Sequence, residues 1–440
     1  MNNKKWMAIL LGGIMAASLA APCSVSAAEK TTLTFWHAMG GTNGEVLQQI
    51  VDDFNASQDE IEIKAEYQGT YDDTITKLKA AMQSDSGLPD VCQMYDVGTK
   101  FMYDSGAVIP VEDKFESTGY DKSSVMEVIS SYYTVDGKQY AMPFNVSTPM
   151  LYYNKDVFEA AGLDPETPPT TYDEVLEDAK KIVESGAAPV GYSQAIYGWF
   201  FEQQLAGLGV TYGNNDNGRK EAVTAVDFDS NGGGLKVFDM WKKLYDSGYF
   251  EDYGTTTADT QTAFFSGQVG MIIESTAILK NAVDSSPFEV GTGYLPRIEQ
   301  NDEGGVIIGG GSLWLTDTGN EANEDAAWKF IEYITTPDVQ AKWSMGTGYF
   351  AINEKAYETD DMKAYLEENP NFETAINQLK DSPVNCNTAG VLSGVQTEAR
   401  LTFNEIMPQV YDGKLTTQDA VDQLAASVNK AIENYNESIK

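Results

Sequence analysis

The chain has 440 residues but only one histidine and three cysteines. A single histidine excludes most Ser–His–Asp and Cys–His catalytic designs, and it excludes metal sites built from several histidines. We expect a structural role for His37, which follows Phe35 and Trp36 at the end of a candidate strand. Cys92 and Cys386 lie far apart, without the spacing of a disulfide framework or a metal site. We expect two buried free thiols, with a single disulfide as the alternative.

Positive charge is also scarce. The chain has 29 lysines and arginines against 66 acidic residues, which gives a formal net charge of -37. The acids are spread along the chain, which is typical of a solvated surface and argues against nucleic acid or an anionic membrane as a partner. Hydrophobic residues make up 42 % of the sequence, so the chain can bury real cores, and its length suits two lobes.

No segment of the sequence is apolar for long enough to span a membrane. The N-terminal residues 1–28 instead follow the pattern of a secretory signal peptide. Lys4 and Lys5 precede a short apolar run, and small residues lead up to cleavage near Ala27 or Ala28. We therefore expect a secreted, periplasmic protein. Lipid attachment at Cys23 is the alternative, which the preceding proline disfavours.

The sequence contains no P-loop. The glycine-rich stretch "IIGGGSLW" at 307–314 lacks the lysine and the spacing of a nucleotide loop. Paired carboxylates can hydrolyse glycosides, but with so many acids no pair stands out. The chain does have 24 tyrosines and 7 tryptophans, several beside glycine in "IYGWF", "GTGYF" and "GGGSLW". Such aromatic faces stack on sugar or polyol C–H groups in binding clefts, although core packing is the alternative for any one of them.

Strand and helix patterns alternate from the start of the mature chain. Strands are predicted at 31–36, 61–67 and 89–95, with helices at 42–54 and 72–82 between them. This order predicts an α/β lobe with a largely parallel sheet. Thr42 with Glu45, and Thr171 with Glu174, form capping-box pairs that predict helix starts, and Gly186 predicts a helix end. The segment 415–439 is one long amphipathic helix with an apolar stripe of Val421, Leu424, Val428, Ile432 and Tyr435.

Four longer stretches follow one another in a familiar order: "LTFWHAMGGTNGEVLQQIVDDFN", "MPFNVSTPMLYYNKDVFEAAGLDPETPPTTYDEV", "GQVGMIIEST" and "IIGGGSLWL". The chain resembles the extracellular solute-binding proteins of ABC importers, in their carbohydrate-binding group, and within it the members that bind glycerol-3-phosphate. The resemblance implies the type II, maltose-binding-like fold, in which two α/β lobes close on a ligand by hinge motion. We expect residues 29–145 plus 277–335 in the first lobe and 146–276 plus 336–440 in the second. The chain then crosses between lobes near residues 145, 276 and 335.

The resemblance also implies a set of ligand-binding positions. These are Tyr71 in "GTYDD", Asp96 in "QMYDVG", Ser147 in "FNVSTP", Ser275 in "IIESTA", Gly310 in "IIGGGSLW", Tyr349 in "GTGYF", and Arg400 in "GVQTEARLTF". In the loop "SQAIYGWFF", Ile196 stands where the glycerol-3-phosphate-binding members carry a tryptophan, three residues before Trp199. The smaller side chain predicts a wider pocket, which would admit a glycerophosphodiester, another sugar phosphate or a neutral oligosaccharide.

Arg400 is one of only three arginines, with Arg219 and Arg297. A guanidinium can donate two parallel hydrogen bonds to a phosphate, and it keeps its charge at every relevant pH. In so acidic a protein the site must supply its own attraction for an anion, from Arg400, Ser275, Thr276 and backbone N–H groups near Gly310. The alternative for Arg400 is a surface arginine paired with Glu398 or Glu405.

The sequence therefore predicts the substrate-binding component of an ABC importer rather than an enzyme. The expected ligand is sn-glycerol-3-phosphate or a glycerophosphodiester, and the expected partner is a membrane permease. A binder of neutral oligosaccharides is the alternative, and a secreted glycoside hydrolase is the more distant one. We expect a monomer with no catalytic residue, no metal and no cofactor.

Overall fold

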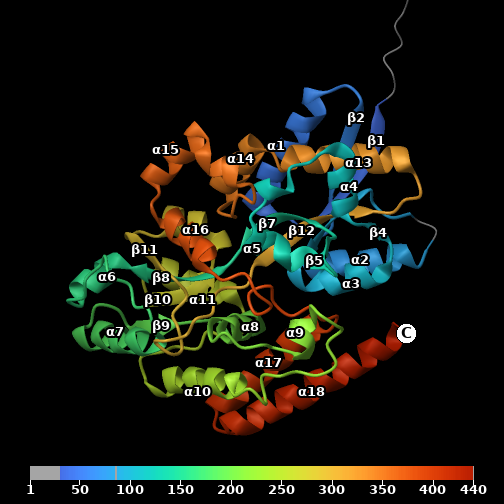
Figure 1. Cartoon of the computed structure of the whole chain (residues 1–440). Coiled ribbons are helices and arrows are strands. Elements are labelled where there is room, and N and C mark those ends of the chain that lie inside the picture. Colours follow the sequence, from blue (N-terminus) through green and yellow to red (C-terminus); the bar gives the residue numbers. More distant parts are fainter. Residues whose placement is uncertain (1–29, 85–86, 440) are drawn as a thin grey trace, which may run out of the picture.

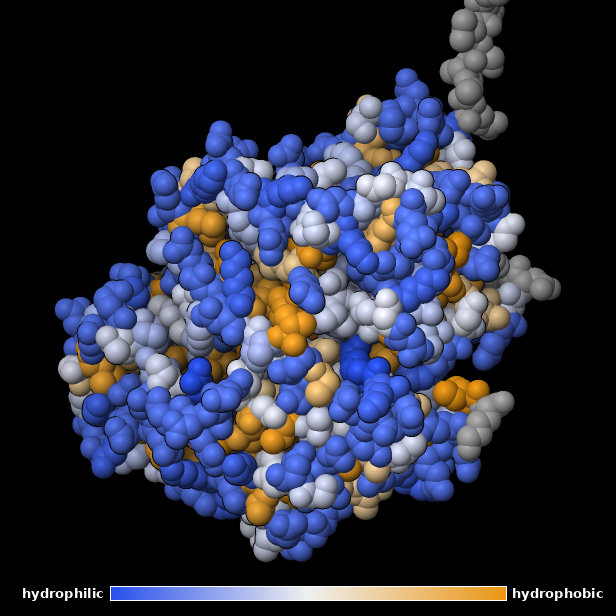
Figure 2. Space-filling model, viewed as in Figure 1, coloured by the Kyte–Doolittle hydropathy of each residue, from blue (hydrophilic) through white to orange (hydrophobic). Residues whose placement is uncertain are grey.

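The computed structural model describes residues 30–84 and 87–439, which form two lobes (Figure 1). The expected signal peptide, residues 1–28, and the possible lipid site at Cys23 lie outside the described residues. Across residues 30–84 and 87–439, we find no helix that combines the length and the apolar character needed to cross a bilayer. Hydrophilic residues cover most of the face shown in Figure 2, as the acidic composition predicts.

The first lobe is built on a six-stranded sheet with the order β2-β1-β3-β12-β4, in which β7 also pairs with β12. Its strands are β1 (Thr31–His37), β2 (Ile61–Tyr67), β3 (Val91–Tyr95), β4 (Val108–Ile109), β7 (Met142–Ser147) and β12 (Gly309–Thr316). β1 lies parallel to β2 and β3, whereas β12 is antiparallel to its three neighbours. The predicted alternation of strands and helices over residues 31–95 is confirmed.

The helices of the first lobe include one whose start differs from the prediction. They are α1 (Gly41–Ser57), α2 (Tyr71–Met82), α3 (Thr99–Ser105), α4 (Val111–Thr118), α5 (Glu127–Ser130), α13 (Glu321–Ile334), α14 (Pro337–Thr347) and α15 (Asp360–Glu368). α1 buries Leu47, Ile50, Val51 and Phe54 as expected. The capping box of Thr42 and Glu45 is wrong, because the helix begins at Gly41 and Thr42 already lies within its first turn.

The second lobe has a four-stranded sheet with the order β11-β8-β10-β9. These strands are β8 (Pro149–Asn154), β9 (Val190–Ser193), β10 (Val269–Ser275) and β11 (Val290–Gly293). Its helices are α6 (Lys155–Ala160), α7 (Tyr172–Ser185), α8 (Gly198–Gly207), α9 (Asn214–Gly218), α10 (Gly233–Asp246), α11 (Thr257–Phe265), α12 (Leu279–Ser285), α16 (Asn371–Asp381), α17 (Gln396–Tyr411) and α18 (Thr417–Ser438). A short hairpin, β5 (Thr134–Val135) and β6 (Lys138–Gln139), belongs to neither sheet.

The sequence signals in the second lobe are confirmed. The Thr171 hydroxyl accepts from the Glu174 N–H while the Glu174 side chain accepts from the Thr171 N–H, and Gly186 ends α7 with φ of 76°. α18 is the long terminal helix, and it buries Val421, Leu424, Val428 and Ile432 against the core of the second lobe. Figure 1 shows its C-terminal end approaching α3 of the first lobe.

The positions where the chain crosses between lobes differ in part from the prediction. The first crossing lies between β7, which ends at Ser147, and β8, which begins at Pro149. Residues 277–335 do not all belong to the first lobe, because β11 pairs with β8 in the second sheet. The second crossing therefore lies between Gly293 and Gly309. The boundary at residue 336 is also wrong, because α14 packs its Trp343 ring on Phe144 of the first lobe, with ring centroids 4.5 Å apart.

The prediction of free thiols is confirmed for Cys92 and Cys386, but the prediction that both are buried is wrong for Cys386. Cys92 is buried and Cys386 is half-buried, and neither forms a disulfide. His37 is buried, and its Nδ1 accepts a hydrogen bond from the Met39 N–H at 3.3 Å. Burial lowers the pKa of His37 to about 4, so this imidazole is neutral near pH 7.

Candidate functional site between the lobes

Arg400 of α17 is buried, and two carboxylates from other elements hold its guanidinium. Its Nε donates to Glu202 Oε1 at 2.8 Å, and its Nη2 donates to Glu202 Oε2 at 2.7 Å. Nη2 also donates to Asp96 Oδ2 at 2.8 Å. The alternative of a surface arginine paired with Glu398 or Glu405 is therefore wrong.

Glycine at position 198 explains how Glu202 reaches Arg400. A Cβ at Gly198 would lie 2.5 Å from the Arg400 Cα, so only glycine lets α8 approach α17 this closely. The Gly198 N–H donates to Asn404 Oδ1 at 2.9 Å and ties the start of α8 to α17. Glu202 follows about one turn later on α8, which places its carboxylate against the guanidinium.

Asp96 belongs to the first lobe, whereas Arg400 and Glu202 belong to the second. We call these three residues the Arg400 cluster. Burial raises the pKa of Glu202, while Arg400 acts to lower it. Although burial alone would lower the pKa of Arg400, Asp96 and Glu202 raise it well above its ordinary value. The cluster thus joins the two lobes through a buried ion pair.

Part of the Arg400 guanidinium remains free for another group. All three bonds described above use Nε and Nη2, and in residues 30–84 and 87–439 no hydrogen bond involves Nη1. Nη1 carries two N–H groups, which can donate to two acceptors or bind one oxygen strongly. An anion that reaches the cluster therefore finds a charged donor in place.

Two of the predicted tyrosines meet in the first lobe. Tyr71 begins α2, and its ring stacks on Tyr95 with centroids 5.2 Å apart. The Tyr71 hydroxyl accepts from Asn145 Nδ2 at 2.7 Å. Tyr349 stacks on Trp343, and its hydroxyl lies beside Asn145 and Tyr71. Burial raises the pKa of both Tyr71 and Tyr349, which keeps these hydroxyls protonated.

Position 310 in β12 can be occupied only by glycine. Its φ is 93°, and a Cβ there would lie 1.8 Å from the Asn145 carbonyl oxygen. Gly309, the residue before it, pairs with Ser147 at the end of β7. A Cβ at Gly309 would lie 2.7 Å from the Trp199 ring, so Trp199 packs directly against β12. Gly310, Ser147 and Trp199 are therefore brought together where the chain leaves the first lobe.

Trp199 has an unused hydrogen-bond donor. Its Nε1 is buried and has no partner within the described residues. Buried polar atoms without partners are uncommon in native proteins and often mark a place where a ligand or water binds. The Ser147 hydroxyl likewise makes no hydrogen bond in the part of the chain that the structure describes, although the residue is buried.

Ser275 and Thr276 lie beside the first crossing between the lobes, from Ser147 to Pro149. The Ser275 hydroxyl accepts from the Ala277 N–H at 3.2 Å, and the Thr276 hydroxyl accepts from the Thr148 N–H at 3.1 Å. Ile196 is fully buried in the core of the second lobe, and its N–H donates to the Gly254 carbonyl at 2.8 Å. That Ile196 sets the width of a ligand pocket stays a prediction.

The sequence did not point to several polar groups of this region. Glu202 binds Arg400, Asn145 binds Tyr71, and Tyr95 stacks on Tyr71. Tyr197 lies near the cluster, with Glu274 near it. The sequence did carry a signal for Glu202, which is an acid in the otherwise apolar start of α8, "GWFFE". Asn145 had none, because its partners come from strands distant in sequence.

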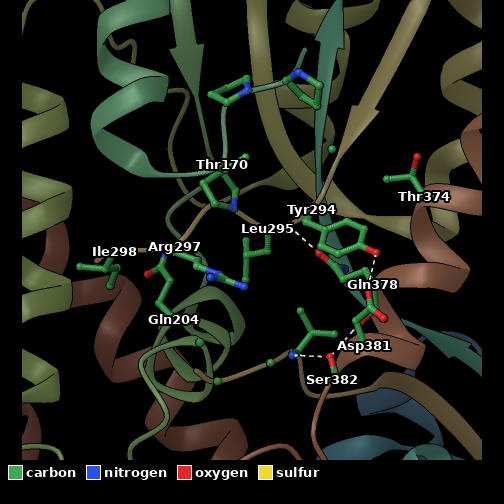
Figure 3. Close-up of a pocket in the computed structure, with 18 of the residues that line it drawn as sticks. Thr170, Gln204, Tyr294, Leu295, Arg297, Ile298, Thr374, Gln378, Asp381 and Ser382 are labelled. Carbon is green, nitrogen blue, oxygen red and sulfur yellow. Dashed lines mark hydrogen bonds between the residues drawn. The ribbon is translucent and has the colours of Figure 1, made fainter. Parts of the chain in front are cut away.

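A hollow of about 560 Å³ lies elsewhere, where the chain crosses from β11 to β12 (Figure 3). α16 lines one side of it, and Tyr294 donates to Asp381 of this helix at 2.7 Å. None of the predicted ligand-binding residues lines this hollow. Within the described residues, no group of three or more His, Cys, Asp or Glu side chains is arranged to hold a metal ion.

Comparison with known proteins identifies the family. The model of the bacterial extracellular solute-binding proteins matches residues 49–374 of the 440. The chain belongs to this family. It is 31 % identical over 417 residues to the sn-glycerol-3-phosphate-binding periplasmic protein UgpB of Escherichia coli K12, covering 93 % of this chain and 94 % of that protein. As a member of the family, it is a substrate-binding protein of an ABC importer, and such proteins bind a small-molecule substrate and work with a permease.

Solved structures share the fold. The cyclic α-maltosyl-1,6-maltose binding protein of Arthrobacter globiformis has a TM-score of 0.76 at 26 % identity, covering 92 % of this chain and 100 % of that one. UgpB of Mycobacterium tuberculosis, solved in complex with glycerophosphocholine, has a TM-score of 0.78 at 20 % identity, with 92 % and 99 % covered. The two-lobed fold expected from the sequence is thereby confirmed.

Proposed function

We propose that this protein captures sn-glycerol-3-phosphate or a glycerophosphodiester between its lobes and delivers it to the permease. The observation that carries the proposal is the free Nη1 of Arg400 inside a buried cluster that joins the lobes. A phosphoryl oxygen is the acceptor that a guanidinium binds best in a protein. The 31 % identical relative from Escherichia coli is named for glycerol-3-phosphate binding, which supports the same ligand class.

The remaining predicted residues supply the rest of such a site. Asp96, Tyr71 and Tyr349 offer hydroxyl and carboxylate groups for the glycerol hydroxyls, and Trp199 offers its buried indole N–H. Ser147, Ser275 and Gly310 lie where the lobes join, so a ligand there would contact both lobes. Closing around the ligand would then present one closed shape to the permease. The proposal includes secretion to the periplasm and a monomeric state.

A neutral oligosaccharide is the second candidate ligand. The two carboxylates of the Arg400 cluster outnumber its one cation, and carboxylates commonly accept hydrogen bonds from sugar hydroxyls. The 26 % identical relative from Arthrobacter globiformis is named for binding a cyclic maltose oligomer. These two observations support a sugar without a phosphate as the alternative ligand.

Calorimetric titration against a small ligand panel decides between the candidates. The panel contains glycerol-3-phosphate, glycerophosphocholine, maltose and a longer maltodextrin, with free glycerol as the control that lacks a phosphate. We expect the two phosphorylated ligands to bind and glycerol to bind poorly. Binding of the oligosaccharides alone would contradict the proposal. Mass spectrometry of the ligands after overnight incubation should find them unchanged, whereas hydrolysis would indicate an enzyme.

A further inference from the structure

We propose that Glu202 determines the charge of the phosphate that this site accepts, favouring a singly charged phosphodiester over a doubly charged phosphate monoester. This inference rests on the proposed function, because it concerns the same ligand class at the same site. It adds a specificity-determining residue that the ligand-binding positions implied by the family resemblance do not include.

The geometry shows how strongly Glu202 competes for Arg400. Both carboxylate oxygens of Glu202 bind the guanidinium, at 2.8 and 2.7 Å. Gln396 Nε2 donates a third hydrogen bond to Glu202 Oε1 at 3.0 Å. A carboxyl group that only accepts, and that faces a guanidinium in this fork arrangement, is favoured in its charged form by that pairing, against the burial that raises the pKa of Glu202. Arg400 therefore offers a ligand one nitrogen rather than its full fork.

The charge balance of the cluster follows directly. One guanidinium faces two carboxylates, Asp96 and Glu202, so the cluster carries one net negative charge. A phosphodiester carries one negative charge at any pH near neutral. A phosphate monoester loses its second proton near pH 6 and then carries about two charges. Since the pair is buried, where charges are poorly screened, the second ligand charge is strongly disfavoured.

Several other titratable groups lie near the cluster, and the tyrosines and the histidine among them do not change charge between pH 5.5 and 7.5. Tyr197, Tyr132 and Tyr212 face Arg400 or Glu202, and burial raises the pKa of all three. Glu274 of β10 lies near Tyr197, and burial raises its pKa as well. The only histidine of the chain, His37, has its pKa lowered to about 4 by burial. Because burial moves the pKa of Glu202 and of Glu274 upwards, towards this range, the diester ligand is needed in the test: it has no second ionisation, so its pH dependence measures the contribution of the protein between pH 5.5 and 7.5.

The test compares glycerol-3-phosphate with its monomethyl ester, which differs by one methyl group and lacks the second ionisation. Calorimetry gives the dissociation constant of each ligand for the wild-type protein at pH 5.5, 6.5 and 7.5 and constant ionic strength. We expect the ratio of the monoester constant to the diester constant to rise about fivefold or more across this range. A ratio that stays constant overturns the inference even if the variant below cannot be purified.

The variant Glu202→Gln keeps the shape of the side chain and removes its charge. We expect its ratio to change less than about twofold over the same pH range, with the monoester gaining affinity at pH 7.5. Glu405→Gln is the matched control, because Glu405 is exposed on α17 and the charge change is the same. If the ratio of the two constants depends on pH in Glu202→Gln as it does in the wild type, the inference is overturned while the proposed function stands. Failure of the wild type to bind either ligand overturns the proposed function and this inference together.

Discussion

Two arginines, the buried Arg400 and the half-buried Arg219, join the lobes by opposite means. Arg400 reaches the first lobe through the carboxylate of Asp96, as part of a cluster with one net negative charge. Arg219 binds backbone carbonyls, and the one that it reaches in the first lobe is that of Tyr132. Its Nη1 donates to the Tyr132 carbonyl at 2.8 Å, its Nε donates to the Gly390 carbonyl at 3.0 Å, and its Nη2 donates to the Ala389 carbonyl. We call Arg219 with these three carbonyls the Arg219 bridge.

The difference shows that an arginine's role depends on what surrounds it. Burial lowers the pKa of Arg219 to about 10, which still leaves the guanidinium charged near neutral pH. All three of its nitrogens bind the chain itself, and its guanidinium also lies 5.1 Å from the centre of the Tyr132 ring. The Arg219 bridge thus holds backbone segments together. Arg400 keeps Nη1 free beside carboxylates, which suits a binding site.

Local sequence supports the Arg219 bridge. The residues just before it, Asn215, Asp216 and Asn217, have positive φ angles of 57°, 55° and 58°. Asparagine and aspartate tolerate this conformation better than most residues. The Asn217 side chain accepts from the Tyr212 and Gly213 N–H groups and donates to the Cys386 carbonyl at 3.0 Å. The motif "GNNDNG" therefore places Arg219 for structure rather than for ligand binding.

The largest effect is expected where the Arg219 bridge is broken. Arg219→Met leaves three carbonyls without their charged donor, so the free energy of unfolding should fall by about 3 kcal/mol. Urea denaturation measures this loss. Arg297→Met is the control, because Arg297 is exposed, and its unfolding free energy should change by less than about 0.5 kcal/mol. Equal values for the two variants would show that the bridge contributes nothing to stability.

A smaller effect, mainly on ligand affinity, is expected when Tyr71 of the proposed ligand site is changed. Tyr71→Phe removes the hydroxyl that accepts from Asn145 Nδ2 and is proposed to face the ligand. The affinity for the phosphorylated ligand should fall by about 1 kcal/mol, measured by calorimetry. Tyr103→Phe, which removes a hydroxyl bonded to Asp136 at the surface, serves as the control. An unchanged affinity in Tyr71→Phe would place this tyrosine outside the site.

The smallest effect is expected at a third contact between the lobes. Tyr435 at the end of α18 donates to Asp104 Oδ2 of α3 at 2.6 Å. Asp104 also binds Lys100, so Tyr435→Phe leaves the carboxylate paired. The free energy of unfolding should fall by about 0.5 to 1 kcal/mol, and ligand affinity should stay within about twofold. A loss as large as that of Arg219→Met would mean that this contact, rather than the bridge, holds the lobes together.

The regular parts of the fold were predictable because their signals are local. The strands and helices over residues 31–95 and the capping box at Thr171 depend on residues a few positions apart. The four-residue strand β11 was assigned to the wrong lobe, because its sequence "VGTG" has no pattern that indicates which strand it pairs with. α14 was also misplaced, because the packing of Trp343 on Phe144 joins residues about two hundred positions apart.

The site was predictable only in part. Arg400 and Asp96 were expected through the resemblance to a family, and the structure places them in contact. The negative charge around them was not expected, because Glu202 reaches Arg400 only through the close approach of α8 to α17 that Gly198 permits. The sequence therefore indicated an arginine for an anion, whereas the structure surrounds that arginine with two acids.

The most direct measurement is calorimetry of wild type, Arg400→Ala and Arg400→Lys with the phosphorylated ligand that binds best. Arg400→Ala should weaken binding by about 1.5 to 3 kcal/mol, the range for a hydrogen bond to a charged group. Arg400→Lys should recover only part of this loss, because an ammonium lacks the planar fork that holds Glu202 and the ligand together. If Arg400→Ala instead binds the phosphorylated ligand as tightly as wild type does, Arg400 does not contact the ligand and the account is contradicted.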